Sequence, residues 1–367
     1  MKTDLCERFG IEYPIFVFTP SEKVAAAVSK AGGLGVLGCV RFNDAEELDS
    51  VLDWMDENTD GKPYGVDIVM PAKVPSEGTA TDLSQYIPDD HKAFVQETLR
   101  KLGVPPLPAD DDPGREGVLG WLHSVARSHV EVALKHRPVL IANALGSPPK
   151  DVIDQAHEHN VVVAALAGKA KHALSHLDNG VDIIIAQGTE AGGHTGEIAT
   201  MVLVPEIVDA VGERGHVLAA GGIGSGRQVA AALALGAHGV WMGSYWLTSS
   251  EYQMGSNDAV KRALLAAGSD QTVRSRVYSG KPARLLKTKW TQAWEDEGAP
   301  SPLPMPLQNL LVNDAHQRIA AANNPEVVAM PVGQIVGRMN EERPVADLIE
   351  ELVRDFEATV SRLDKLR

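Results

Sequence analysis

The chain has 367 residues, of which 44% are hydrophobic and 23% are charged, and its formal net charge is −15. This composition is typical of a soluble globular protein of one to three domains. The negative charge disfavours a broad surface for nucleic acid or for an anionic membrane, because the phosphate groups would be repelled.

The cysteines and the apolar runs narrow the class further. Cys6 and Cys39 are the only cysteines, so they form no disulfide framework, and they lack the spacing of a zinc site. The first eight residues contain no apolar signal core. Residues 228–250 reach the ~20 uncharged residues that a membrane span requires, but glycines interrupt them, which indicates a buried helix and strand. We therefore expect a cytoplasmic protein with no membrane partner, no nucleic-acid partner and no metal site.

Short apolar runs that predict β-strands alternate with segments that predict helices. The runs are apolar at both odd and even positions, as is typical of strands buried on both faces. The predicted strands cover residues 14–18, 34–37, 65–69, 139–142, 161–166, 182–186, 216–219 and 239–242. The predicted helices between them cover residues 22–31, 45–57, 150–159, 169–179, 202–211 and 226–235.

Eight strands with intervening helices predict a parallel α/β sheet closed into a (β/α)₈ TIM barrel, which we assign to residues 1–250. A doubly wound open sheet is the alternative. It is disfavoured because no Gly-x-Gly-x-x-Gly follows the first strand.

Two regions do not fit the alternation. Residues at about 71–137 are interpreted as an insertion after the third strand, Pro-, Asp- and Gly-rich at first and helical near 118–135. The insertion is either part of a lid or a surface loop with local helices. Residues 251–367 are predicted to form a helical annex packed on the barrel. Its helical patterns cover 258–267, 306–321, 326–339 and 344–366, and the Pro-rich connection 295–306 lies between the first two.

A glycine-rich loop follows the sixth predicted strand and contains His194. Residues 186–196 include four glycines, which suggests a backbone that approaches a ligand closely or takes up positive φ. We predict that His194 is the catalytic base, although most of the 12 histidines must be incidental. Glu190, in the same loop, could orient His194 or be solvated.

Two further glycine turns follow the seventh and eighth strands. Residues 219–226 run from a strand into a helix, and residues 239–244 end in Gly243 and Ser244. The loops after these two strands form the usual phosphate site of barrel enzymes, and a helix N-terminus adds a positive dipole end. Glycines that merely make tight turns are the alternative.

These motifs carry a family resemblance. Residues 187–196 resemble the Gly-Gly-His loop of the nitronate monooxygenase family, formerly the 2-nitropropane dioxygenases, and the match continues through 219–226 and 241–244. Weaker matches are Tyr13-Pro14, residues 279–284 and 302–306, and Gly333-Gln334. The resemblance spans nearly the whole chain apart from the insertion, and it implies FMN bound at the C-terminal mouth of the barrel.

The resemblance also implies which residues form the site. His194 would be catalytic, and FMN would contact the backbone or side chains of Phe16, Val17, Phe18, Thr19, Asp67, Gln187, Gly188, Gly192, Gly193, Ala220, Gly221, Gly222, Gly243, Ser244 and Gln334. Two positions depart from the pattern. Many relatives have Asn where this chain has Asp67, and an ionised Asp cannot donate a hydrogen bond. Some relatives have Lys where it has Leu166, and Lys169 lies three residues later.

The resemblance implies a nitronate monooxygenase that oxidises alkyl nitronates or nitroalkanes with O₂ to a carbonyl compound and nitrite. One alternative is an NAD(P)H-dependent flavin reductase acting on quinones or enoyl thioesters. A second is a non-redox barrel enzyme that binds a phosphorylated ligand. The partners would be a small-molecule substrate and either O₂ or NAD(P)H. Whether the chain forms a homo-oligomer is left open.

Two further groups of residues each allow two interpretations. Asp110–Asp112 could bind a cation or be solvated. Four tryptophans could line the pocket or pack in the core, namely Trp241, Trp246, Trp290 and Trp294.

Overall fold

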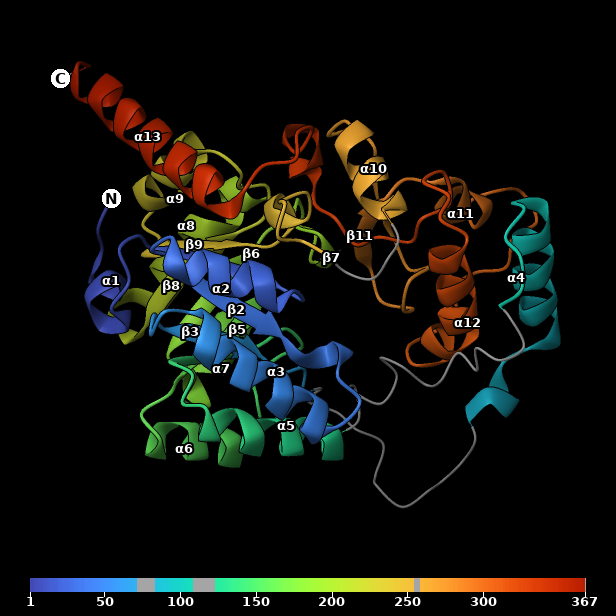
Figure 1. The fold of residues 1–367 in the computed structure, drawn as a ribbon, viewed down its shortest axis with the longest axis horizontal. Coiled ribbons are helices and arrows are strands. Elements are labelled where there is room, and N and C mark those ends of the chain that lie inside the picture. The colour runs from blue at the N-terminus through green and yellow to red at the C-terminus, as the bar shows by residue number, and fades with distance from the viewer. Residues whose placement is uncertain (71–82, 108–122, 254–257, 367) are drawn as a thin grey trace.

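The structure is a computed structural model that describes residues 1–70, 83–107, 123–253 and 258–366. Eight parallel strands form a closed barrel, which confirms the predicted fold (Figure 1). In barrel order they are β1 (Ile15–Thr19), β2 (Leu34–Gly38), β3 (Tyr64–Asp67), β4 (Leu140–Asn143), β5 (Val162–Ala167), β6 (Ile183–Gln187), β8 (His216–Ala220) and β9 (Gly239–Met242).

Helices surround the barrel. They are α2 (Glu22–Lys30), α3 (Ala45–Asn58), α5 (His123–Lys135), α6 (Lys150–Glu158), α7 (Ala170–Asp178), α8 (Thr200–Val211) and α9 (Gly226–Ala234). Short 3₁₀ turns are η1 (Cys39–Arg41), η4 (Gly212–Arg214) and η5 (Ser244–Trp246). No helix of the described ranges is both long and apolar enough to span a membrane.

Helix α1 (Asp4–Phe9) closes the N-terminal end of the barrel. Its Leu5 and Phe9 are buried in the same apolar cluster as the inward-facing strand residues. The rings of Phe9 and Phe16 meet edge to face with centroids 5.5 Å apart. The interior of the barrel is therefore filled at its N-terminal end, and only the C-terminal end remains for a ligand.

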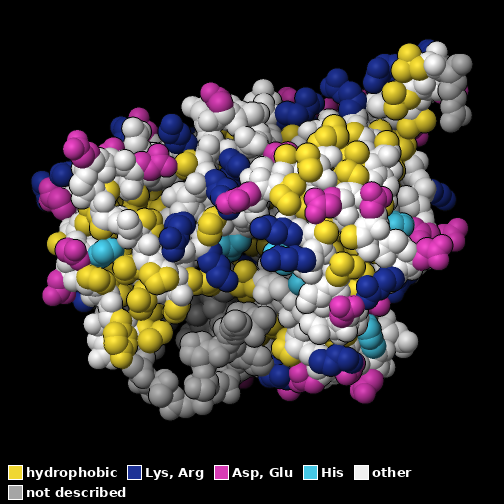
Figure 2. All heavy atoms as spheres, turned by 180° about the vertical axis from the view of Figure 1, so that it is seen from behind, with side chains coloured by type: hydrophobic (Ala, Val, Ile, Leu, Met, Phe, Trp, Pro, Cys, Tyr) yellow, Lys and Arg dark blue, Asp and Glu magenta, His cyan; other side chains and the backbone are white. Residues whose placement is uncertain are grey.

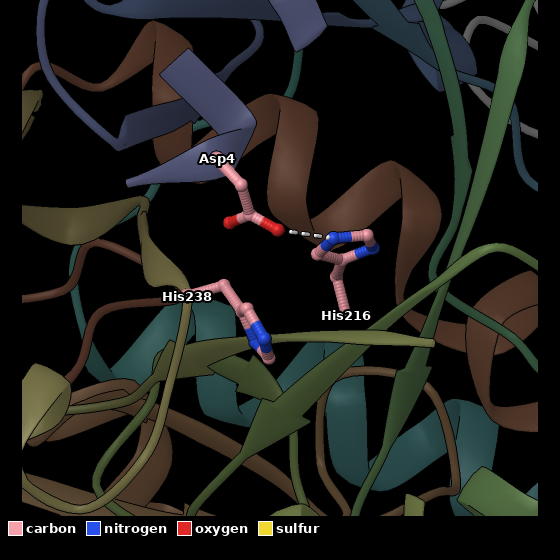
Figure 3. A group of neighbouring side chains, drawn as sticks. All are labelled: Asp4, His216 and His238. Atoms are coloured by element: carbon pink, nitrogen blue, oxygen red, sulfur yellow. Dashed lines mark hydrogen bonds and ion pairs between the residues drawn. The ribbon is translucent and has the colours of Figure 1, made fainter. Parts of the chain in front are cut away.

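A hydrogen bond between Asp4 and His216 fastens α1 to the barrel (Figure 3). The Oδ2 atom of Asp4 lies 2.7 Å from Nε2 of His216, at the start of β8, and His238 lies beside them. Nδ1 of His238 accepts a hydrogen bond from the backbone N–H of Val217 at 3.1 Å. A neutral His238 ring therefore carries its hydrogen on Nε2, so it offers no lone pair to a metal. We interpret this group as a structural latch.

The C-terminal helix α13 (Val345–Asp364) completes the ring of barrel helices. It packs on α9 and on α2, which follow strands β8 and β1, so it occupies the eighth helical position (Figure 1). The prediction assigned all residues after 250 to an annex, and it did not include the return of α13 to the ring of barrel helices. A Cβ at Gly226 would lie 2.2 Å from the carbonyl oxygen of Leu352 and from the nitrogen of Phe356. Glycine at this position allows α13 to cross the start of α9.

We expect Gly226→Ala to destabilise the protein by roughly 1–3 kcal/mol, because the added methyl group would push α13 off the barrel. In a helix without such a crossing, Gly→Ala stabilises by about 1 kcal/mol, so the sign of the change is diagnostic. Urea unfolding measures it, with Ala234→Gly on the exposed face of α9 as the control. A more stable Gly226→Ala protein would contradict the crossing.

A second lobe lies beside the barrel (Figure 1). It contains α10 (Ala259–Ala266), β10 (Thr272–Ser275), β11 (Ala283–Leu286), α11 (Lys289–Ala293) and α12 (Leu307–Ala321). The annex was predicted to be helical, and the two antiparallel strands were missed. The predicted helix over 326–339 was also wrong. Only the turn η6 (Gln334–Arg338) forms there, because Pro331 lacks an N–H and the preceding chain pairs with β11 through Leu286 N and Met330 O.

Residues 83–107 of the predicted insertion belong to this second lobe, whereas α5, which was counted in the insertion, packs on α3 and is a barrel helix. The part in the second lobe comprises η2 (Leu83–Tyr86) and α4 (Asp89–Lys101), and α4 packs against α12. Val95 and Leu99 share an apolar cluster with Trp290. The guanidinium of Arg318 also donates to the carbonyls of Val104 and Pro105. The segment is thus part of the lobe's core, whereas Asp110–Asp112 lie outside the described residues.

Candidate active site

The C-terminal mouth of the barrel is lined by the last inward-facing residue of several strands. By strand alternation these include Phe18, Asp67, Leu166 and Gln187. Three of them keep partial exposure, whereas Phe16, one layer below, is fully buried. Asp67 is 2% exposed. The barrel interior is therefore closed at the layer of Phe16 and becomes partly accessible at its C-terminal mouth.

His194 is held by a second, small sheet. Gly193 and His194 form β7, which pairs antiparallel with Arg284 and Ala283 of β11, in the order β10–β11–β7. Nε of Arg284 also donates to the carbonyl of Thr189 at 2.8 Å. The glycine loop after β6 is consequently fixed by the second lobe.

Glu190 does not orient His194. Its carboxylate accepts hydrogen bonds from the backbone N–H of Thr200 at 2.9 Å and from the Thr200 hydroxyl at 2.8 Å. Thr200 is the first residue of α8, so Glu190 caps that helix, as acidic side chains do at helix N-termini. The cap ties the loop after β6 to α8, and Glu190 is neither a catalytic partner nor freely solvated.

Ser279 binds the imidazole of His194. Its hydroxyl lies 2.6 Å from Nε2 of His194 and accepts the backbone N–H of Lys281 at 3.3 Å. Burial lowers the pKa of His194 to about 4, and the nearby positive charge of Lys281 adds to this. His194 is therefore neutral near pH 7, as predicted, but it is a weaker base than a histidine in water.

Sequence reasoning assigned no role to Ser279. The signal was present, since residues 279–284 matched the family pattern. The role depends on the hairpin of β10 and β11, which brings Ser279 to a histidine 85 residues away in sequence. Local periodicity carries no information on such a pairing.

The turn after β8 has a backbone conformation that favours glycine. Gly221 and Gly222 have φ of 107° and 70°, values that side chains disfavour. A Cβ at Gly221 would lie 2.8 Å from the Thr200 hydroxyl. Within the described ranges, the backbone N–H groups of Gly222 and Ile223 make no hydrogen bond. The turn therefore presents donors for an anion.

The helix that follows contributes less to this cradle than predicted. Two of the first N–H groups of α9 are already bound: Arg227 N donates to Asp355 of α13 and Gln228 N to Ser225. The side chain of Gln228 folds back onto the turn, where it accepts from Gly224 N at 3.0 Å and donates to Gly222 O. The anion site is thus the glycine turn, braced by Gln228, more than the helix N-terminus.

Gly243 and Ser244 lie on the neighbouring strand end. A Cβ at Gly243 would meet nothing closer than Phe18, at 3.8 Å, so the space above it is open. The hydroxyl of Ser244 accepts the backbone N–H of Gly333 at 2.9 Å. Gln334 N in turn donates to the carbonyl of Glu190 at 2.9 Å. The segment before η6 therefore joins the loops after β6 and β9.

A cavity of about 480 Å³ opens beside the glycine turn. It brings together three of the predicted residues, Gly221, Gly222 and Gln334. Its remaining lining includes Met201 and Val204 of α8 and Ala231 and Ala232 of α9, together with polar side chains such as Glu190 and Arg338. This size is within the usual range for small-molecule sites.

Other predicted residues lie near the mouth without offering a side chain to it. Phe16 and Val17 are fully buried, and the Thr19 hydroxyl accepts the backbone N–H of Ser21. Lys169 is exposed before α7, so it does not replace a lysine at Leu166. The four tryptophans are buried in the core: Trp241 and Trp246 in the barrel, Trp290 and Trp294 in the second lobe.

The mouth fits a flavin on structural grounds. Gly193 has φ 74° and nothing within 4 Å of a Cβ, and Gly243 is similarly open. In the described residues, the backbone N–H groups of Gly222 and Ser244, in the turns after β8 and β9, make no hydrogen bond. Any side chain at these glycines would fill the cradle. An anionic group with an adjoining planar ring matches this combination of donors and free volume.

Comparison with known proteins places these features in one family. The family model described as nitronate monooxygenase matches residues 2–355. A Mycobacterium tuberculosis protein named "Putative monooxygenase Rv1533" is 48% identical, over 100% of this chain and 99% of the relative. A "Probable nitronate monooxygenase" of Staphylococcus haemolyticus is 28% identical, over 97% of this chain and 98% of the relative.

Solved structures agree with the fold. A nitroalkane oxidase from Streptomyces ansochromogenes superposes with a TM-score of 0.79 at 26% identity, covering 98% of this chain and 99% of that chain. FabK from Thermotoga maritima superposes with a TM-score of 0.75 at 27% identity, and the whole of both chains is covered.

Proposed function

We propose that this chain, which belongs to the nitronate monooxygenase family, oxidises alkyl nitronates with O₂ to a carbonyl compound and nitrite, with FMN as its flavin. Membership of the family makes it a flavin-dependent oxidoreductase. The observation that carries the proposal is a neutral His194, held by Ser279 on an open glycine loop, in the same barrel mouth as the glycine turn.

FMN would be held by the chain's own backbone. Gly222, Gly243 and Ser244 would bind the phosphate through N–H groups, and Phe18, Asp67 and Gln187 would surround the ring. The bound flavin supplies the electron transfer between substrate and O₂, which no side chain provides. FMN is proposed over FAD because the glycine turn provides a terminal phosphate site.

His194 handles the proton of the substrate. With a neutral nitroalkane, the imidazole takes the proton from the carbon next to the nitro group, and the electron pair of the broken C–H bond moves into that group. A pKa of about 4 makes His194 a poor base for this step. The lowered pKa therefore favours a substrate that arrives already as the nitronate anion, which His194 only has to orient.

Lys281 supports the preference for an anion, since its positive charge reaches His194. Lys and Arg side chains also gather in the middle of the face seen in Figure 2, between the barrel and the second lobe. In a chain of net charge −15, a local positive field between the barrel and the second lobe would attract an anionic substrate.

Replacing Lys281 with Gln is expected to lower kcat/KM for a nitronate by about 3- to 10-fold at low salt, and by less at high salt, because the exposed charge is screened. The value for the neutral nitroalkane should change little. Steady-state oxygen uptake at two ionic strengths measures both. The control is Lys30→Gln, at the other end of the barrel. Equal losses for both substrates would contradict a steering role.

The alternative function is an NAD(P)H-dependent flavin reductase that acts on quinones or enoyl thioesters. Oxygen uptake and nitrite release with a nitronate, compared with anaerobic bleaching of the flavin band by NADH or NADPH, decide between the two. We expect nitronate-dependent oxygen uptake and slow bleaching. Rapid bleaching without nitronate turnover would reject the monooxygenase. A protein that cannot be reconstituted with FMN would favour the non-redox barrel enzyme.

A further inference from the structure

Asp67 is a carboxyl group in an unusual position. It is the last residue of β3, in register with Gly38 of β2 and Ala142 of β4. Val66 and Tyr64 pack outward in the cluster that faces the helices, so Gly65 and Asp67 face the barrel interior. Asp67 is 2% exposed and stands at the level where Phe18 and Gln187 line the mouth.

No group in the described parts of the chain neutralises this carboxyl. Burial is the only influence on its titration, without an ion pair or hydrogen bond. The neighbouring buried amide of Asn143 shows the contrast, because it exchanges hydrogen bonds of 3.0 Å with the backbone N–H and carbonyl of Met70. An unpaired buried carboxylate is costly, so either a ligand must satisfy Asp67 or it must hold a proton.

The charged and titratable groups around Asp67 favour the second alternative, in which its carboxyl holds a proton. The titratable side chain that faces Asp67 is Cys39, at the end of β2, and burial raises the pKa of its thiol so that it stays neutral. Arg41 influences Cys39, but it has no effect on Asp67. Burial raises the pKa of Asp67 to about 7.

We propose that Asp67 contacts the flavin ring as a neutral carboxylic acid that donates a hydrogen bond to a ring acceptor, and that its ionisation weakens cofactor binding. The inference rests on the proposed function in that it needs FMN in the mouth. A neutral carboxyl donates one hydrogen bond, as an amide does, whereas a carboxylate only accepts. Asp67, where many relatives have Asn, therefore keeps the hydrogen bond to the ring and makes that bond dependent on pH.

The test measures FMN affinity rather than activity. Apoprotein is titrated with FMN by flavin fluorescence at a series of pH values from about 6 to about 8.5. The wild-type Kd should rise by about 30-fold over this range, which is the loss of one proton with a pKa near 7. The isosteric Asp67→Asn protein should bind without this rise, and Asp209→Asn on the exposed face of α8 should behave as wild type. The FMN phosphate also ionises, but this changes the affinity of all three proteins in the same way, so the difference between them reports on Asp67.

Thermal unfolding of the apoproteins gives a second readout. The folded-state pKa lies above the unfolded value of 3.8, so wild type should lose stability relative to Asp67→Asn as pH rises from about 4 to about 7. Parallel FMN-affinity profiles, or parallel unfolding profiles, for wild type and Asp67→Asn would overturn the role of Asp67 while leaving the flavin in place. Absence of FMN binding in every variant at every pH would overturn both the role and the proposed cofactor.

Discussion

Replacement of His194 with Asn is expected to lower kcat/KM for a neutral nitroalkane by about 10²- to 10⁴-fold, because the proton on carbon then has no acceptor. Asn is chosen since its amide can still hydrogen bond to the Ser279 hydroxyl, which lies 2.6 Å from the imidazole. The loss for the preformed nitronate should be much smaller, as no proton is removed. Oxygen uptake with each form measures the two values, and His172→Asn on the exposed surface of α7 is the control.

The pH profile of the wild-type enzyme tests the same assignment. A base must be unprotonated, and the pKa of His194 is lowered to about 4. Activity on the nitroalkane should therefore be level from about pH 6 upward and fall only as pH drops toward 4. Ser279→Ala should shift this limb, because it removes the hydrogen bond to Nε2. Equal activity of His194→Asn and wild type on the neutral nitroalkane would reject His194 as the base.

Gly243→Val is expected to weaken FMN binding by roughly 100-fold or more, equal to about 2.7 kcal/mol. Gly243 has φ −113° and ψ −67°, and a Cβ there meets nothing closer than 3.8 Å. The new side chain therefore strains little in the apoprotein but occupies the space left for the cofactor phosphate. Fluorescence titration with FMN measures the change.

The apoprotein provides the control for this variant. Its free energy of unfolding in urea should stay within about 0.5 kcal/mol of wild type, as is usual for substitutions without a clash. A variant that binds FMN normally would exclude Gly243 from the cradle. A variant that loses stability to the same extent as affinity would show that Gly243 serves the fold instead.

The amino-acid sequence alone determined the barrel and the location of its chemistry. Eight apolar runs bounded by turns are a local signal, and each became a strand of the closed barrel. The glycines of residues 186–196 were predicted to approach a ligand closely or to take up positive φ, and Gly193 has a φ of 74°. His194 was placed at the carboxyl end of a barrel strand because it follows the sixth run directly. These inferences needed only the neighbours of each residue in the chain.

The tertiary structure decided what surrounds those residues. Ser279 reaches His194 through a hairpin in the second lobe, and α13 returns to the barrel after that lobe. Such contacts join distant parts of the chain, and hydrophobic periodicity does not encode them. Asp67 was read as an ionised carboxylate, yet burial without a partner raises its pKa to about 7, so the neutral form prevails below that pH. A pKa depends on the desolvation and charges around a group, which only the folded arrangement defines.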